Sequence, residues 1–403
     1  MNSPDRLSLT SKNPLKMDST PVPLLDVNRG NSLIREEIIA AITQVVDSGR
    51  FLHGPEVGEL ECAMAGVAKT KHAIGCASGS DALLLALMAL EIGPGDEVIL
   101  PSFTFFATAS CVSRVGAKVV FVDIDPTTYN LSPEAVRDAI TSRTKAIIPV
   151  HLFGQCAPMD EICAIAEAHK IAVIEDAAQA IGAAYQDRPA GAWGHIGCFS
   201  FYPTKNLGGM GDGGILTCQD DAMTAKLRLY ASHGMQPRYH HKVIGINSRL
   251  DTIQAAILGV KLNRLNEYTH SRQANATRYH QWFSEAEIET GTQGRFDLPK
   301  TIPGALHVWN QYGIRVHEGR RDQLKAHLQE QKIGAEIYYP IPLHMQECYR
   351  SLGYAKGSLP ETERASKEIL HIPIYPELTL LEQRAVVDAI ECFYASAAYR
   401  RVA

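Results

Sequence analysis

The sequence predicts an α/β protein with a mainly parallel sheet flanked by helices. From about residue 73 to 218, short runs of β-branched residues alternate with helical stretches, which is typical of strands joined by crossover helices. Several of these runs end in polar residues. Open α/β sheets bind ligands outside the carboxyl ends of their strands, so we expect a functional site at that edge.

Six strands are expected in this region, over residues 97–100, 118–123, 145–150, 171–174, 198–202 and 214–217. Gly116 ends the helix before the second strand, and Ser132 with Pro133 begins the helix that follows it. The third and fourth strands enclose a helix over 159–169, which makes a β-α-β unit. The last two strands flank a glycine-rich loop.

A long polar helix over 250–279 is expected to lead away from this sheet. The pattern then restarts with a strand over 312–316, a helix over 322–331, a strand over 337–339 and a last helix over 380–396. The sequence thus predicts a disordered lead-in over 1–20, a large cofactor-binding domain over 21–270 and a smaller C-terminal α/β domain over 271–403.

Composition narrows the class of protein. The chain has 403 residues, 45% of them hydrophobic, and a formal net charge of −5. With no Lys/Arg-rich block it offers no surface for nucleic acid, so we expect no nucleic-acid partner. Its most apolar stretch, 82–90, is far shorter than the roughly 20 residues that span a bilayer, and we expect no membrane association. The N-terminus lacks the apolar core of a secretion signal, and we expect a cytoplasmic protein.

The cysteines do not form a metal-binding pattern. All nine are scattered, without a C-x-x-C pair or zinc-like histidine spacing. We therefore expect reduced thiols and no metal site.

Lys205 ends an aromatic strand and leads directly into glycine-rich backbone, in FSFYPTKNLGG. A lysine after a strand is usually solvated. Among aromatic side chains, however, its amine is desolvated and its pKa falls, which makes it a nucleophile able to form a Schiff base.

Asp176 follows an apolar strand at the edge of the sheet where ligands bind, in VIEDAAQ. One interpretation is that it caps the next helix. The other is that its carboxylate holds the protonated ring nitrogen of a cofactor, with Gln179 one helical turn later reaching a neighbouring oxygen.

A third feature is the helix start ASGSD at 77–81. Its free amides and positive dipole end suit an anion, and Gly79 permits close approach, although serine and aspartate also begin helices simply as caps. The glycine run 208–214 has neither dinucleotide nor P-loop spacing and is interpreted as close packing beneath a cofactor. Phe105 is a candidate to lie against a ring, or a plain core residue.

A buried amine, a strand-end carboxylate and a helix N-terminus match the needs of pyridoxal 5'-phosphate. The amine bonds to the aldehyde, the carboxylate keeps the pyridine protonated, and the helix N-terminus holds the phosphate. The sequence therefore predicts this cofactor.

The chain resembles the DegT-type (DegT/DnrJ/StrS) sugar aminotransferases, which are pyridoxal-phosphate enzymes of fold type I, from about Leu24 to the last helix. The resemblance is carried by SGSDAL at 78–83, GPGDEVILPSFTFFATA at 93–109, PVHLFGQCAPMD at 149–160, VIEDAAQAIGA at 173–183, FSFYPTKNLGGMGDGG at 199–214 and GINSRLDTIQAA at 245–256.

The resemblance implies a role for each matching residue. Lys205 bonds to the aldehyde, shuttles the proton and is the catalytic residue. Asp176 pairs with the pyridine nitrogen, and Gln179 contacts the ring hydroxyl. The remaining implied cofactor contacts are Gly79, Ser80, Asp81 and Ser200 to the phosphate, Phe105 to the ring face and Asn247 to the phosphate of the neighbouring subunit of a homodimer.

The implied reaction moves an amino group from an amino acid, by family analogy L-glutamate, to a nucleotide-linked keto-sugar. The segment 337–344 resembles the corresponding segment of relatives that aminate the 3-keto position. It makes Tyr339 and His344 candidates for sugar contact, or else ordinary packed or surface residues. Two alternatives are a non-catalytic regulator or sensor that binds pyridoxal phosphate on the same scaffold and a sugar dehydratase that depends on pyridoxal phosphate. Dehydratase relatives replace the lysine with histidine, so Lys205 argues against the second.

Overall fold

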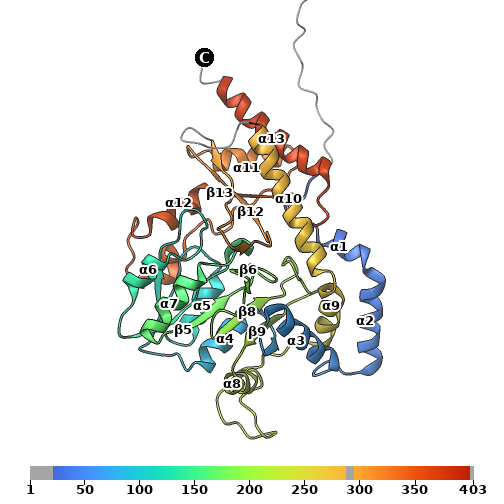
Figure 1. Ribbon diagram of the computed structural model, residues 1–403, viewed down its shortest axis with the longest axis vertical. Helices are drawn as coiled ribbons and strands as arrows, with labels where there is room; N and C mark the ends of the chain where they lie inside the picture. Colours follow the sequence, from blue (N-terminus) through green and yellow to red (C-terminus); the bar gives the residue numbers. More distant parts are fainter. Residues whose placement is uncertain (1–20, 287–294, 400–403) are drawn as a thin grey trace, which may run out of the picture.

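A seven-stranded sheet forms the centre of the larger part of the molecule (Figure 1). The computed structural model describes residues 21–286 and 295–399. The strands lie in the order β1-β9-β8-β5-β4-β2-β3. They are β1 (His72–Cys76), β2 (Glu97–Pro101), β3 (Lys118–Val122), β4 (Thr144–Ile147), β5 (Ala172–Asp176), β8 (Ile196–Ser200) and β9 (Gly214–Cys218). Only β9 runs antiparallel to its neighbours β1 and β8 within this sheet, so the predicted mainly parallel sheet is confirmed.

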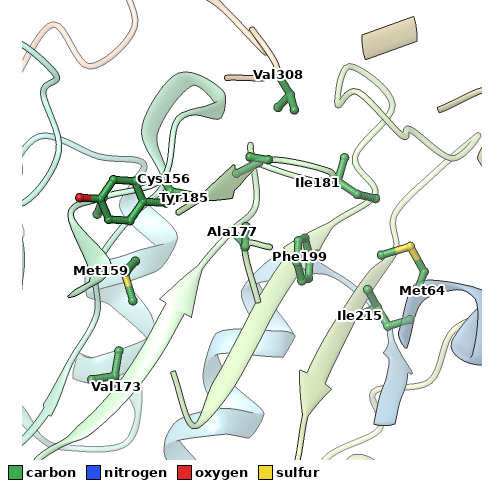
Figure 2. Packing of buried hydrophobic residues seen from close by; sticks show 14 of the residues in the cluster. Met64, Cys156, Met159, Val173, Ala177, Ile181, Tyr185, Phe199, Ile215 and Val308 are labelled. Carbon is green, nitrogen blue, oxygen red and sulfur yellow. The ribbon is translucent and has the colours of Figure 1, made fainter. Parts of the chain in front are cut away.

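Alternating side chains bury both faces of this sheet, because successive residues of a strand point to opposite sides. One face packs against α3 (Pro55–Ala68), α7 (Met159–His169) and α9 (Thr252–Leu262). Figure 2 shows Val173, Phe199 and Ile215 on this face, with Met64 of α3 and Met159 of α7 in the same cluster. The other face packs against α4 (Gly79–Ala89), α5 (Phe106–Arg114) and α8 (Asp221–Ala231).

A smaller three-stranded sheet has its own core. It has the order β10-β12-β13, formed by β10 (Phe296–Asp297), β12 (Tyr312–Val316) and β13 (Ile369–Ile372). The helices α10 (Leu265–Glu285), α11 (Arg321–Glu330) and α13 (Leu380–Tyr399) pack against it, as the upper part of Figure 1 shows. We call this part the small domain. The boundary expected near residue 270 stays a prediction.

The remaining elements lie around these two sheets. The remaining helices are α1 (Val27–Leu33), α2 (Arg35–Ser48), α6 (Pro133–Ala139) and α12 (Pro360–Glu368). The 3₁₀ turns are η1 (Leu152–Gly154), between β4 and α7, and η2 (Leu343–Met345) and η3 (Glu347–Leu352), between α11 and α12. A small sheet of β6 (Ala184–Tyr185), β7 (Arg188–Pro189) and β11 (Ala305–Leu306) completes the fold. Within the described ranges, no helix has the length and apolar character needed to cross a bilayer.

Two predicted elements differ from the structure. The helix expected over 250–279 is two helices, α9 and α10, with a break at Asn263 and Arg264. Leu258 of α9 packs into the core of the large sheet and Tyr279 of α10 into that of the small sheet, so the chain bends to serve both cores. The strand expected over 337–339 is absent, because Tyr339 has a φ of +62° and only Glu336 pairs with β13. The lead-in over 1–20 lies outside the described residues.

Candidate active site

The ends of several strands of the large sheet border a cavity of about 520 Å³, which also reaches the small domain. A cavity beside Pro203 and Glu377 and another beside Tyr129 are smaller, at about 50 and 10 Å³. Most of the predicted site residues line the main cavity, namely Gly79, Ser80, Phe105, Asp176, Gln179, Ser200, Lys205 and Tyr339. They come from segments far apart in the chain, and the fold brings them together at the edge where an open α/β sheet binds ligands.

Lys205 lies in the turn after β8, where its backbone N–H donates to the carbonyl of Tyr202 at 2.9 Å. Its side chain lines the cavity beside the glycine-rich loop. Burial lowers the pKa of Lys205 to about 8, although the carboxylate of Asp176 acts in the opposite direction. A substantial share of this amine is therefore neutral near physiological pH, which is the form that attacks an aldehyde.

Asp176 is the last residue of β5, is buried and lines the cavity. Burial raises the pKa of this carboxyl group, and a hydrogen bond from the Thr108 hydroxyl is the largest influence in the opposite direction. Thr108 Oγ1 donates to Asp176 Oδ2 at 2.7 Å, and the N–H of Ala178 donates to Oδ1 at 3.2 Å. A cation placed against this carboxylate would favour its charged form further.

Gln179, three residues after Asp176, also lines the cavity. Its Oε1 accepts a hydrogen bond from the N–H of Phe153 at 2.7 Å, and its Nε2 donates to the Tyr339 hydroxyl at 2.8 Å. Tyr339, which makes this contact, is also the residue whose positive φ interrupts the strand expected over 337–339. Burial raises the pKa of Tyr339, so the phenol keeps its proton.

The N-terminus of α4 opens onto the cavity. Ser78 caps the helix by accepting from the N–H of Asp81 at 3.1 Å, and Gly79 and Ser80 begin the first turn. A Cβ on Gly79 would lie 2.7 Å from Cβ of Ser200, so only glycine allows this helix end to lie so close to β8. Backbone N–H groups beside the Ser200 hydroxyl form a suitable cradle for a phosphate.

Three predicted residues do not line the cavity. Asn247 is exposed, as a contact to another subunit would require, and its backbone pairs with that of Ser232. Asp81 lies in the first turn of α4 and uses its N–H for the cap. His344 is buried, and its Nδ1 lies 2.7 Å from Ser102 Oγ, so the packed interpretation fits its position better than sugar contact.

Phe105 lines the cavity and is 61% exposed, which leaves its ring free to stack.

Sequence reasoning missed two groups of residues. Thr108 gives no local signal, because its partner Asp176 is 68 positions away. The small domain contributes Asn310, Gln311 and His371 to the cavity, and none belongs to a motif considered above. Only the packing of the two domains brings them to the site.

These residues fit pyridoxal phosphate. The cavity joins a desolvated amine to a buried carboxylate with a fixed donor, and a helix N-terminus with a neighbouring hydroxyl lies on the same cavity. Those are the aldehyde, ring-nitrogen and phosphate contacts that this cofactor needs.

Comparison with known proteins agrees with this geometry. The model of the DegT/DnrJ/EryC1/StrS aminotransferase family matches residues 32–391. The chain is 48% identical over 93% of its length to a "pleiotropic regulatory protein" of Geobacillus stearothermophilus, with 98% of that protein covered. It is 43% identical over 89% of its length to the UDP-N-acetyl-3-dehydro-alpha-D-glucosamine 3-aminotransferase of Acidithiobacillus ferrooxidans, with 94% of that protein covered.

A solved structure is similar over almost the entire fold. The crystal structure of Streptomyces venezuelae DesV in complex with a ketimine intermediate has a TM-score of 0.89 and 40% sequence identity. The match covers 93% of this chain and 99% of that one. The predicted fold type is thereby confirmed.

Proposed function

This chain belongs to the DegT/DnrJ/EryC1/StrS aminotransferase family, whose members depend on pyridoxal phosphate, and we propose that it transfers an amino group from L-glutamate to the 3-keto group of a nucleotide-linked sugar. That it is a sugar transaminase follows from its relatives. The observation that carries the proposal is the meeting of Lys205, Asp176 and the α4 N-terminus in one cavity.

Lys205 is the group that we assign to proton transfer. When bound, pyridoxal phosphate supplies an aldehyde that accepts the amino group and a ring that takes up the electron pair left after loss of a proton. Lys205 Nζ, with its pKa lowered to about 8, can take a proton from the donor's α-carbon and return it at a neighbouring carbon. The same nitrogen reverses these steps on the sugar, so one residue serves both halves of the reaction.

Asp176 and Gln179 are assigned to orientation. The Asp176 carboxylate would hold a proton on the ring nitrogen, and the hydrogen bond from Thr108 favours the charged form of that carboxylate and fixes its position. Gln179, fixed by the N–H of Phe153, presents its amide next to the Tyr339 hydroxyl. Gly79, Ser80 and Ser200 would hold the phosphate, and Phe105 would stack on the ring. Asp81 would contribute to the phosphate site indirectly, because its N–H donates to Ser78 in the cap of α4.

The assignment of Lys205 is tested by chemical trapping. We expect the purified protein to be yellow and borohydride to fix the cofactor on Lys205, as peptide mass spectrometry would show. Lys205→Ala should lose both the adduct and amino transfer. Lys261→Met is the matched control, since Lys261 is also buried but does not line the main cavity. A colourless protein that cannot be reconstituted contradicts the proposal, whereas a protein that binds the cofactor but transfers no amino group would indicate the non-catalytic regulator.

The position of amination is tested with substrates. The protein is incubated with glutamate and a panel of 3-keto and 4-keto nucleotide sugars, and products are identified by mass and coupling constants. We expect amination of a 3-keto sugar. If only 4-keto sugars are aminated, the proposed amination at the 3-position is wrong. A keto-deoxysugar formed without consumption of glutamate would instead indicate a dehydratase.

The proposal includes a homodimer with shared sites. Asn247 is exposed, and so are the nearby apolar residues Ile244 and Tyr239, at 92% and 75%. Contiguous exposed apolar patches often mark surfaces that a partner covers, and these two side chains support such a surface near Asn247. We assign Asn247 to the phosphate site of the second copy, and sedimentation analysis would test the dimer.

The proposal also includes a cytoplasmic location. All nine cysteines are free in the structure, as expected for a reducing compartment. Cell fractionation tests this directly.

A further inference from the structure

The small domain contributes to the cavity a group of buried polar atoms that make no hydrogen bond to any described residue. They are Asn310 Oδ1, Gln311 Oε1 and both ring nitrogens of His371. All three residues line the main cavity, and we call them the small-domain wall. Buried polar atoms are almost always paired in folded proteins, so several unpaired ones beside a cavity indicate a ligand that pairs with them.

His371 is held in a fixed orientation on this wall. It lies in β13, and its backbone exchanges hydrogen bonds with Glu336 at 2.8 and 3.1 Å. Its ring packs edge-on against Phe153 and Tyr338, with centroid distances of 4.6 and 4.8 Å. A Cβ on Gly313 of the neighbouring strand would lie 2.9 Å from His371 Nε2, so a glycine there leaves room for the ring.

The wall carries no positive charge. Burial lowers the pKa of His371 to about 3, although the nearby backbone and carboxylate of Glu336 act in the opposite direction. The neutral imidazole has one N–H donor and one acceptor nitrogen, and the amides of Asn310 and Gln311 each offer both a donor and an acceptor. Hydroxyl groups, which also donate and accept, match this set, whereas a carboxylate or phosphate would require cations or donors alone.

The wall's position favours the sugar ring over the other parts of the substrates. Among described lining residues the cationic side chain is Lys205, which belongs to the large domain. The reacting keto carbon must come close to that amine. The remaining positions of the sugar ring then extend within the same cavity, whose lining includes the small-domain wall.

We propose that the small-domain wall binds hydroxyl groups of the sugar ring of the keto-sugar substrate, with His371 as the residue that determines specificity. This inference rests on the function proposed above. His371 acts in binding, so its loss should affect the sugar half of the reaction and spare the amino-acid half.

The test measures the two half-reactions of the holoenzyme separately. His371→Phe keeps a ring of similar size but removes hydrogen bonding, and we expect the KM for the keto-sugar to rise about tenfold. His371→Asn restores a donor and an acceptor and should recover much of this loss. The glutamate half-reaction, followed by cofactor absorbance, should stay within about twofold in both variants. His327→Gln, on the outer side of the small domain where Nε2 contacts the Ala389 carbonyl at 3.0 Å, is the matched control and should leave both half-reactions unchanged.

Specific results would overturn the inference. A higher KM for glutamate with an unchanged KM for the sugar would assign the wall to the amino donor. If the His371 variants do not fold, Gln311→Met tests the same wall, and an unchanged sugar KM in that variant rejects the subsite. A wild-type enzyme without any glutamate half-reaction instead refutes the proposed function, so the two failures are distinguishable.

Discussion

Thr108→Val removes one hydroxyl from beneath the carboxylate of Asp176 while keeping the shape of the side chain. Thr108 is fully buried and donates to Asp176 Oδ2 at 2.7 Å. The other oxygen, Oδ1, keeps its hydrogen bond from the N–H of Ala178 at 3.2 Å. The variant therefore weakens the carboxylate's hydrogen bonding without removing its charge.

The size of the effect follows from the loss of one charge-assisted hydrogen bond. Such a bond contributes about 1.5–3 kcal/mol, which corresponds to roughly one to two pKa units. Burial already raises the pKa of Asp176, and the Thr108 hydroxyl opposes this rise, so the pKa should increase further in the variant. A carboxyl group with a higher pKa competes more strongly for the proton on the ring nitrogen. If about half of the free energy reaches the transition state, kcat falls roughly three- to thirteenfold.

The assay is single-turnover absorbance of the glutamate half-reaction, with Thr108→Ser as the matched control that keeps the hydroxyl. The valine variant should be slow with a nearly unchanged KM for the sugar, and the serine variant should remain close to wild type. Equal rates in the valine variant and the wild type would refute the view that Thr108 supports Asp176. A serine variant as slow as the valine variant would show that packing, and not the hydrogen bond, is responsible.

Three further predictions concern the cofactor contacts. The rate at which the apoprotein captures pyridoxal phosphate should rise with pH through about 8, because only neutral Lys205 attacks the aldehyde; a stopped-flow profile that is flat from pH 7 to 9 contradicts this. Gly79→Ala should weaken cofactor retention about tenfold in equilibrium dialysis, because its Cβ would press on Ser200, whereas Gly66→Ala, with open space around it, should not. Asn247→Ala mixed with Lys205→Ala should regain activity through hybrid dimers with one intact site, and no recovery after verified subunit exchange opposes a contact across the interface.

The strands of the large sheet could be predicted because their apolar runs are short and regularly spaced. All six expected strands are present, with ends that differ by three residues or fewer, and β12 has the expected bounds. The motif around Lys205 could be located for a similar reason, since an aromatic strand ending in lysine and glycines is visible in a single segment. These features depend on local sequence.

Features that depend on distant partners could not be predicted. His344 follows a proline-rich segment that suggests a site, but Ser102, 242 positions away, holds it inside the protein. The break between α9 and α10 has no proline or glycine to mark it and follows from the need to pack against two sheets. His371 lies in a strand that the sequence analysis did not predict, and only the meeting of the domains brings it to the cavity.

The neighbouring carboxylates Glu175 and Asp176 illustrate why sequence alone leaves their roles open. They point to opposite sides of β5, since side chains alternate along a strand. Glu175 is fully buried and accepts four hydrogen bonds, from His151 and from the N–H groups of Gly191, Trp193 and Gly194. Both of its carboxylate oxygens accept hydrogen bonds from the protein, so its role is to fix the loop over 191–194. Asp176 accepts fewer bonds and borders the cavity. A carboxylate can bind a ligand cation only when the protein leaves part of its capacity unused, and of these two residues Asp176 alone meets that condition.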